Sequence, residues 1–382
     1  MAACKLRKQD SGHESSTTFG LKSAGAYPRT GSRFAFGGGG MKLQQLRYFL
    51  AVVENGFSVT AAADAVFTSQ PGISKQIRLL EDELGVQLFE RRGKRLECLT
   101  VAGEELVKRV RRVLHEVSQI KSLAEELRGE AAGELRLATT HTQARYVLPP
   151  IIREFGEAHP EVVFNVHQGT SEQIARMVAE QQVDVVIATG GENLFPGLIR
   201  LPVYRWDRIV LVPKKHELAK RPGPLSLKTL SSYPLVTYLF SDQPESSLMR
   251  AFDQAGQKPR IAFTARDADV IKTYVRMGMG VGVLAGMAVE AGVDEDLVAI
   301  DASGLFPRLT TWVGFRPDFL LRRFHLDFFQ RLAPHLDEET IARAIELKNS
   351  EEIAALFNPR DIPLRETEGL ASKPLAVSRM AC

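Results

Sequence analysis

Two groups of polar residues in this sequence have types and spacing that suit binding chemistry. The first group recurs at helical spacing and consists of Gln70, Ser74, Lys75 and Arg78. Glutamine can bond adenine or phosphate, serine and lysine can contact phosphates or base edges, and arginine can bond guanine through two hydrogen bonds. Many helices expose such residues to water, so this pattern alone leaves DNA contact and a solvated helix face equally open.

The second group is the run Thr139-Thr140-His141-Thr142-Gln143, which follows an expected strand and precedes an expected helix. Hydroxyl groups and free helix amides converge there, and the positive end of the helix dipole favours a small anion. The alternative is that a threonine simply caps the helix. Thr189 ends a later strand before Gly190-Gly191, so it can face the same cleft at the carboxyl ends of the strands.

Signatures of catalysis are weak in this sequence. Gly278, Gly280 and Gly282 precede an expected strand and do not open a helix, so the setting of a phosphate-binding loop is missing. No histidine pair has the spacing of a helical metal site, and His141 is more typical of a polar turn than of a base. No serine stands in a nucleophile elbow. We therefore expect no enzyme, no catalytic residue, no metal site and no cofactor.

Composition limits the class of protein further. A chain of 382 residues with 44% hydrophobic residues is long enough for two or three packed domains. The 49 Lys and Arg barely exceed the 46 Asp and Glu, so any DNA contact must come from a local basic patch. Cys4, Cys98 and Cys382 lack the spacing of a disulfide framework or a zinc site, which favours a reducing cytoplasm. No apolar run predicts a membrane span or a signal peptide.

The first forty residues are rich in glycine, serine, threonine and basic residues and show no apolar period. This composition predicts a disordered extension over residues 1–40. Because the extension ends in a glycine run directly before Met41, we expect Met41 to be the native start.

The first polar group lies in an expected DNA-binding domain over residues 41–100, which begins with three helices. Apolar spacing, caps and turn residues set their limits. The predicted elements are a helix from Leu43 closed by Asn55-Gly56, an alanine-rich helix after Ser58 or Thr60, a turn at Phe67 and Thr68, and a helix from Ser69, with Pro71 in its first turn, to about Leu84.

The third helix and the segment after it supply two surfaces for DNA. Ile73, Ile77, Leu80 and Leu84 form its expected buried stripe, while Pro71, Ser74, Lys75 and Arg78 project from the opposite face. Strands at Val86–Phe89 and Leu96–Leu99 then flank a basic hairpin, a wing, whose Arg91, Arg92 and Lys94 can reach phosphates. Two helices, a tight turn and a wing together favour DNA binding.

A long linker helix is expected over residues 101–130, capped by Thr100. Apolar residues repeat in it at spacings of four and three: Leu106, Val110, Val113, Val117, Ile120, Ala124 and Leu127. This heptad pattern predicts a coiled-coil-like dimer helix. The alternative is a helix packed on its own domain.

Short strands alternate with helices over residues 131–335, which predicts an α/β domain. One lobe covers residues 131–203 and 309–335, and the other covers residues 204–308. A C-terminal helix and a loose tail are expected over residues 336–382.

The stretch TSQPGISKQIRLLE at Thr68–Glu81 resembles the signature of LysR-type transcriptional regulators. Three segments are similar to the subgroup of that family that controls sulfur genes: ATTHTQARYVL at residues 138–148, YPLVTY at 233–238 and DADVIKTYVR at 267–276. The resemblance covers about residues 41–357. The family fold is α/β with an N-terminal all-α winged helix-turn-helix, a long linker helix and a two-lobed effector domain like a periplasmic binding protein.

The resemblance implies a regulator that mainly activates sulfate assimilation and cysteine biosynthesis genes, with acetylserine and with sulfate or thiosulfate as small-molecule effectors. Its partners would be promoter double-stranded DNA, RNA polymerase and copies of itself, as a homotetramer. The implied DNA contacts are Thr68, Ser69, Gln70, Pro71, Ser74, Lys75, Arg78, Arg91, Arg92 and Lys94. The implied effector contacts are Thr140, Thr142, Gln143, Thr189, Tyr204 and Trp206.

One departure concerns the second lobe, where Phe240-Ser241-Asp242-Gln243-Pro244 replaces a loop that bears Thr-Gly in similar regulators. An acidic Asp242 would weaken sulfate binding there. Three alternatives stay open: a regulator of sulfate-starvation genes, a sulfate-type anion-binding protein and an enzyme of sulfur metabolism. The second predicts an export signal and no wing, and the third needs a nucleophile or a cofactor loop.

Overall fold

The computed structural model describes residues 40–93, 95–128, 132–190, 194–220, 223–347 and 349–367. Contacts divide the chain into two compact units, Met1–Val117 and Ser118–Cys382. The expectations for residues 1–39, for Lys94 and for residues 368–382 lie outside the described residues. No helix within the described ranges is long and apolar enough to cross a membrane.

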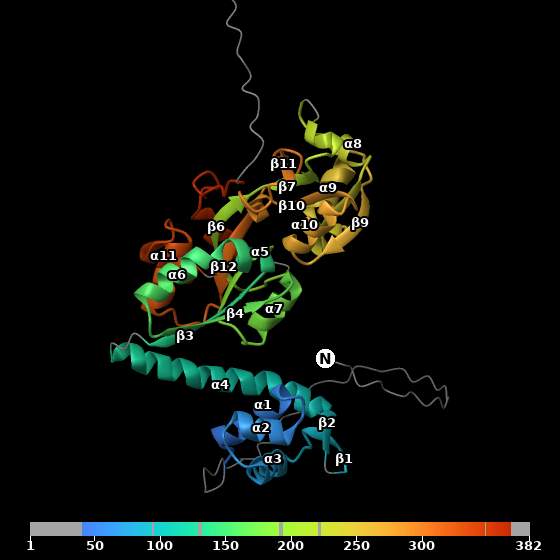
Figure 1. Cartoon of the computed structure of the whole chain (residues 1–382). Coiled ribbons are helices and arrows are strands. Elements are labelled where there is room, and N and C mark those ends of the chain that lie inside the picture. The colour runs from blue at the N-terminus through green and yellow to red at the C-terminus, as the bar shows by residue number, and fades with distance from the viewer. Residues whose placement is uncertain are drawn as a thin grey trace, which may run out of the picture. The chain divides into compact units, whose positions relative to one another are not determined.

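The first unit contains the helix-turn-helix and the wing (Figure 1). Ser58 caps the second helix by accepting a hydrogen bond from the Ala61 amide, and Ser69 caps the third by accepting from Gly72. Gly85 adopts a left-handed conformation, with φ of 68°, at the end of the third helix. The elements are α1 (Leu43–Glu54), α2 (Val59–Ala65), α3 (Gln70–Leu84), the antiparallel pair β1 (Phe89–Arg92) and β2 (Arg95–Leu99), and α4 (Val101–Leu127).

The buried face of α3 differs from the expected stripe at its end. Ile73, Ile77 and Leu80 are buried in the core of this unit, but Leu84 is 38% exposed. Glu81 is buried instead, because its carboxylate accepts hydrogen bonds from the amides of Leu88 and Phe89. β1 begins at Phe89, later than the start at Val86 that the sequence suggested.

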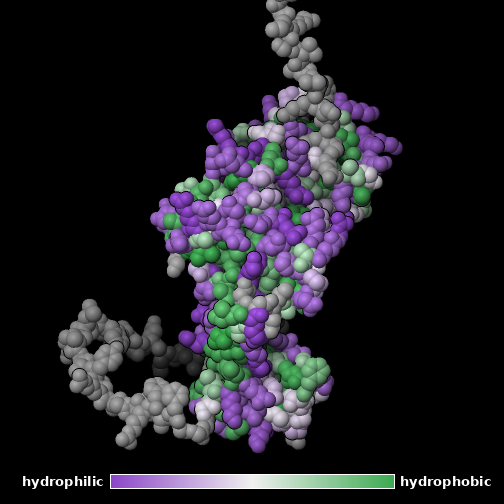
Figure 2. Space-filling model, turned by 90° about the vertical axis from the view of Figure 1, so that its left-hand side faces the viewer, coloured by the Kyte–Doolittle hydropathy of each residue, from purple (hydrophilic) through white to green (hydrophobic). Residues whose placement is uncertain are grey.

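The long helix α4 has two different halves. Val107 and Val110 belong to the core of the first unit, as the alternative of packing on its own domain predicts. Further along, Val113, Ile120, Leu123 and Leu127 are exposed, with Ile120 at 67% and Leu127 at 80%. Figure 2 shows hydrophobic side chains on the surface at the height of α4 in Figure 1. The second half therefore presents an apolar stripe with no cover from this chain's described residues.

The second unit contains two five-stranded sheets, each with helices around it (Figure 1). Lobe one has the strand order β4-β3-β5-β12-β6, and lobe two has β11-β7-β10-β8-β9. The strands of lobe one are β3 (Gly133–Thr139), β4 (Val162–Gln168), β5 (Val185–Thr189), β6 (Ile199–Trp206) and β12 (Leu309–Phe315). Those of lobe two are β7 (Arg208–Pro213), β8 (Pro234–Tyr238), β9 (Arg260–Ala265), β10 (Val281–Ala285) and β11 (Leu297–Asp301).

The helices of the second unit cover these sheets and follow the α/β order that the sequence predicts. Those of lobe one are α5 (His141–Tyr146), α6 (Leu148–Ala158), α7 (Ser171–Ala179) and α11 (Arg323–Leu332). Those of lobe two are α8 (Leu227–Leu230), α9 (Ser247–Gln254) and α10 (Ala268–Arg276), and α12 (Glu338–Leu347) and α13 (Ser350–Ala355) follow near the C-terminus.

The crossing between the lobes lies at Asp207, later than the boundary at residue 204 that the sequence suggested. β6 stays paired with β12 up to Trp206, and β7 begins two residues later. The chain returns to lobe one between β11 and β12. The Asp207 carboxylate accepts hydrogen bonds from the guanidinium of Arg308 at 2.9 to 3.2 Å, so an ion pair joins the two crossings.

Part of the expected loose tail is docked on lobe one. The amide of Arg205 donates to the carbonyl of Pro363 at 2.7 Å, and the amide of Arg365 donates to the carbonyl of Arg205 at 2.8 Å. The tail thus adds backbone hydrogen bonds to the outer edge of β6. An edge strand offers unpaired amides and carbonyls, and this segment covers some of them.

Candidate functional sites

The exposed face of α3 carries the residues predicted to read DNA. Gln70, Lys75 and Arg78 are exposed, and Ser74 is half-buried and accepts a hydrogen bond of 3.4 Å from the Gln70 amide nitrogen. The remaining predicted contacts stand at the start of the helix. These are Thr68 at the end of the turn, Ser69, whose hydroxyl caps the helix, and Pro71 in the first turn.

The wing does not use its two arginines alike. Arg92 is 86% exposed and approaches Glu97 at 3.7 Å, a weak contact for two solvated side chains. Arg91 turns back and forms an ion pair with Glu81. Of these two arginines, Arg92 therefore extends into solvent from the wing, whereas Arg91 is held against α3.

Glu81 is the residue that sequence reasoning missed in this half of the chain. It stands near the end of α3 and accepts hydrogen bonds from the amides of Leu88 and Phe89 and from the guanidinium of Arg91. A buried carboxylate is costly unless it is paired and hydrogen-bonded, and Glu81 is both. It fixes the wing relative to α3. The sequence signal for this buried role was a glutamate placed among the apolar residues of the buried face of α3.

The second polar group surrounds the start of α5 in lobe one. Thr140 is the residue before the helix, but its hydroxyl makes no capping hydrogen bond. Simple capping by threonine, the alternative reading of this turn, therefore has no support from this side chain. Thr142 and Gln143 are buried, and His141 is partly exposed.

Four of the predicted effector residues and Thr311 form one hydrogen-bonded cluster in lobe one. The hydroxyl of Thr311 accepts a hydrogen bond of 3.1 Å from the indole N–H of Trp206. The same hydroxyl lies 3.1 Å from the Thr189 hydroxyl and 3.5 Å from the Gln143 amide nitrogen. The hydroxyl of Tyr204 donates to the amide oxygen of Gln143. We call these five residues the Thr311 cluster.

The register of β12 explains why Thr311 lies at the centre. In the antiparallel pairs, Thr311 stands opposite Thr189 on β5 and opposite Tyr204 on β6. The sequence offers no signal for this role, because Thr311 is one of two adjacent threonines in β12 and lies more than a hundred residues from its partners.

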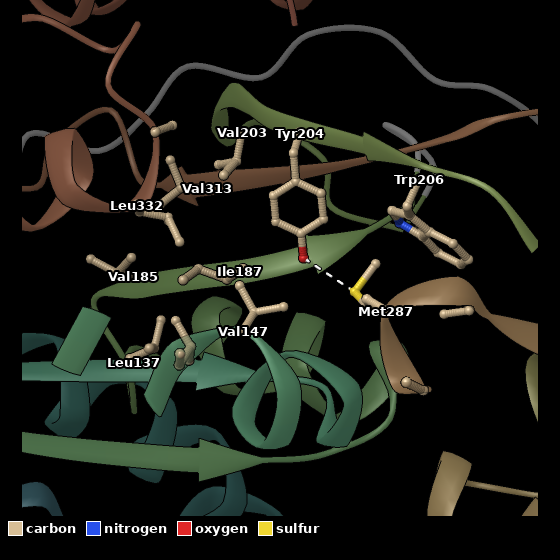
Figure 3. Packing of buried hydrophobic residues seen from close by; sticks show 14 of the residues in the cluster. Leu137, Val147, Val185, Ile187, Val203, Tyr204, Trp206, Met287, Val313 and Leu332 are labelled. Atoms are coloured by element: carbon tan, nitrogen blue, oxygen red, sulfur yellow. Dashed lines mark hydrogen bonds between the residues drawn. The ribbon is translucent and has the colours of Figure 1, made fainter. Parts of the chain in front are cut away.

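Tyr204 connects the cluster to lobe two. Figure 3 shows its hydroxyl directed at the sulfur of Met287, at 3.8 Å. Burial raises the pKa of Tyr204 to about 12, so the phenol stays protonated and can donate hydrogen bonds at neutral pH.

Other contacts also join the lobes near this cluster. The Tyr146 hydroxyl donates to Asp269 at 2.6 Å, and Arg145 pairs with Glu290 at 3.0 Å. Burial raises the pKa of Tyr238 in lobe two, and a hydrogen bond with Thr142 of lobe one opposes that rise. Thr142 and Tyr204, two of the predicted effector residues, therefore lie where the two lobes meet.

One trio among the described residues has the spacing of metal ligands. His141, Asp267 and Asp269 offer atoms within 4.8 Å of one another. Both carboxylates already serve the fold, because Asp267 caps α10 through the Val270 amide and Asp269 accepts the Tyr146 hydroxyl. The trio is therefore explained without an ion.

Two family models match this sequence. Residues 43–104 match the bacterial regulatory helix-turn-helix protein of the lysR family, and residues 128–337 match the LysR substrate binding domain. The second match covers more than half of the chain. The first match lies in the first unit and the second match in the second unit.

Individual relatives point to a subgroup. The chain is 45% identical to the HTH-type transcriptional regulator CysB of Haemophilus influenzae over 83% of this chain and 98% of that protein. It is 37% identical to the HTH-type transcriptional regulator cbl of Escherichia coli, over 82% and 99% respectively.

The fold of this chain is similar to the folds of regulators with known crystal structures. The cofactor-binding domain of the Cbl transcriptional regulator superposes with a TM-score of 0.53 at 36% identity, covering 56% of this chain and 93% of that domain. Full-length CbnR, complexed with its target DNA, gives a TM-score of 0.57 at 24% identity over 78% of this chain and 100% of CbnR, which shows a shared fold.

Proposed function

We propose that this chain, which belongs to the LysR family of transcriptional regulators and to its CysB and Cbl subgroup, controls sulfate assimilation and cysteine biosynthesis genes, mainly as an activator. Its effectors would be acetylserine and a sulfur oxyanion, sulfate or thiosulfate. The observation that carries the effector assignment is the Thr311 cluster, which gathers predicted effector residues from three separate segments at the junction of the lobes.

The cluster has the chemistry that a small oxyanion requires. An indole N–H, an amide and several hydroxyls meet within hydrogen-bond distance and in a buried setting. In the described structure these groups bond to one another, so an effector must replace those bonds. A buried N–H or hydroxyl left without a partner costs free energy, which makes a ligand with several acceptor oxygens the suitable replacement.

Effector binding acts on DNA through a change in the populations of two states. A ligand can shift such an equilibrium only by binding one state more tightly than the other. Groups at the junction of the lobes can supply this difference, because Tyr204 and Tyr146 reach residues of the opposite lobe. The change would alter the spacing of DNA-binding domains on the promoter.

The partners follow from the surfaces. Promoter double-stranded DNA would contact α3 and the wing, and the apolar stripe of Ile120, Leu123 and Leu127 would pair subunits into a homotetramer. RNA polymerase would be the partner at activated promoters. We place the protein in the cytoplasm, where its DNA target lies.

Footprinting tests the effector assignment. Wild-type protein on a cysteine-biosynthesis promoter is titrated with acetylserine and, separately, with sodium sulfate against sodium chloride at equal ionic strength. We expect at least one effector to change the length or spacing of the footprint. If the footprint is the same with and without both ligands, the effector assignment is wrong.

Two single variants test the division between reading helix and wing. Arg78→Ala should relax base preference, whereas Arg92→Ala should weaken binding to all sequences alike and flatten the salt dependence of the dissociation constant. Equal behaviour of the two variants on matched and scrambled promoter fragments would contradict this division.

A further inference from the structure

Arg208, the first residue of β7, is a buried cation with no carboxylate partner among the described residues. It is 3% exposed, and its Nη1 atom has no hydrogen-bond partner among the described residues. The guanidinium packs against aromatic rings: it lies 6.0 Å from the ring centre of Trp206 and 5.8 Å from that of Phe306. The side chain therefore lacks the opposite charge that burial of a guanidinium requires.

Other buried cations of the second unit are paired. Lys272 lies 2.9 Å from Asp294, and the partly buried Arg136 bonds Asp184 at 2.8 Å. The carboxylate nearest to Arg208 in sequence, Asp207, already binds Arg308. Moving a guanidinium out of water without an opposite charge beside it costs free energy, and contacts with aromatic faces offset only part of that cost. Consistent with this, burial lowers the pKa of Arg208 to about 10.

The position of Arg208 places it at the ligand-binding edge of lobe two. It stands opposite Ala285, the last residue of β10, and the Ala285 amide donates to the hydroxyl of Tyr238, the last residue of β8. β8 and β10 are parallel, and ligands of α/β sheets bind at the carboxyl ends of parallel strands. The Trp206 ring beside the guanidinium also bonds Thr311, so Arg208 adjoins the Thr311 cluster.

A second unpartnered polar group follows the same strand. Ser241, three residues after the end of β8, is fully buried, and its hydroxyl has no hydrogen-bond partner in the described part of the chain. The sequence suggested that the negative charge of Asp242 would weaken the binding of an anion in lobe two. Asp242 is exposed, so water screens its charge.

We propose that Arg208 supplies the positive charge that binds the anionic group of the effector, sulfate or a carboxylate, from the side of lobe two. This inference rests on the proposed function. It gives the two lobes different roles: the Thr311 cluster offers neutral hydrogen-bond donors, and Arg208 offers a charge. An anion bound by both would hold the lobes together and would remove the cost of the unpaired guanidinium.

Calorimetric titration of the full-length protein tests this role. Sodium sulfate and acetylserine are titrated into wild type, Arg208→Met, Arg208→Lys and the control Arg200→Met at constant ionic strength. Arg200 is a matched control because its guanidinium also lies over an indole, 5.7 Å from the ring centre of Trp312.

For Arg208→Met we expect a loss of affinity of roughly 10- to 100-fold, the range for one charge-assisted hydrogen bond. Arg208→Lys should retain part of the affinity, and Arg200→Met should bind as wild type does. A loss for sulfate alone assigns Arg208 to the oxyanion, and a loss for both ligands assigns it to their shared charge.

The melting temperature without ligand separates binding from packing. If Arg208 serves the effector, Arg208→Met should melt at the wild-type temperature or above, because an unpaired buried charge is removed. A clear drop in melting temperature with unchanged affinity would make Arg208 a packing residue and overturn the inference. Wild-type protein that binds neither ligand would overturn the effector assignment itself, whereas equal binding by wild type and Arg208→Met overturns only the role of Arg208.

Discussion

The indole N–H of Trp206 donates a hydrogen bond to the hydroxyl of Thr311 across 3.1 Å, although 105 residues separate the two in sequence. Trp206 is the last residue of β6, and Thr311 lies near the start of β12, its antiparallel partner. Directly beyond Trp206 the chain crosses to lobe two. The bond therefore joins the predicted effector residues to the point where the lobes meet.

Thr311→Val should damage both stability and effector binding. Valine keeps the shape of threonine but leaves the indole N–H of Trp206 without its acceptor in a buried site, at a cost of about 1–3 kcal/mol in the free energy of unfolding. Sulfate affinity should fall roughly tenfold, the equivalent of about 1.4 kcal/mol. Denaturant unfolding and calorimetry measure the two effects. Thr310→Val is the matched control, and equal results for the two variants would contradict a central role for Thr311.

Glu81→Gln should loosen the wing. The substitution removes the ion pair with Arg91 while keeping the size of the side chain, so the first unit should lose about 1–3 kcal/mol of stability. Asp82→Asn removes the same charge from the exposed side of α3 and should have little effect. Thermal unfolding and promoter affinity, compared between these variants, measure the change. Indistinguishable variants would show that Glu81 does not hold the wing.

Shortening the tail should destabilise the second unit. A chain that ends at Asp361 lacks the backbone bonds to Arg205 and the contact from the Arg365 guanidinium to the Tyr146 carbonyl at 3.2 Å. Compared with a chain that ends at Thr367, it should melt several degrees lower. Because Arg365 also lies over the Tyr204 ring, the shorter chain should bind sulfate more weakly. Identical melting of the two chains would show that residues 362–367 add no stability.

Acid should destabilise the second unit through His325. This side chain is buried beside Arg322, and burial first, then the nearby positive charge, lower its pKa to about 3 from an ordinary 6.5. Between these values the unfolded chain binds a proton that the folded chain does not. The free energy of unfolding should therefore fall as pH drops below 6.5, by up to about 1.4 kcal/mol per pH unit from this group.

His325→Gln should reduce this dependence, because glutamine does not titrate and can still accept the Arg322 amide that the imidazole accepts at 3.0 Å. His167→Gln, at an exposed position of β4, is the control. Unfolding curves from pH 4 to pH 7 give the slope for each protein. A slope in His325→Gln equal to that of wild type would exclude His325 as the cause.

The sequence by itself determined the local structure of this protein. Helical spacing, serine caps and a glycine stop depend on neighbours within a few residues, so they predicted α1 to α4 and the α/β order of the second unit. The same short-range signals identified the polar face of α3 and the turn from Thr139 to Gln143. These residues need only their own helix or turn to be positioned.

Only the tertiary structure decided how distant segments meet. The pairing register of β12 placed Thr311 among Thr189, Tyr204 and Trp206, and a buried Glu81 withdrew Arg91 from the wing surface. The edge of β6 bound the tail. Arg208 appeared in the sequence as an ordinary arginine. Only the packing of aromatic rings around it showed a buried charge with no carboxylate partner in the part of the chain that the structure describes. Sequence periodicity reports which side of an element is apolar, whereas strand register and burial depend on the whole packed domain.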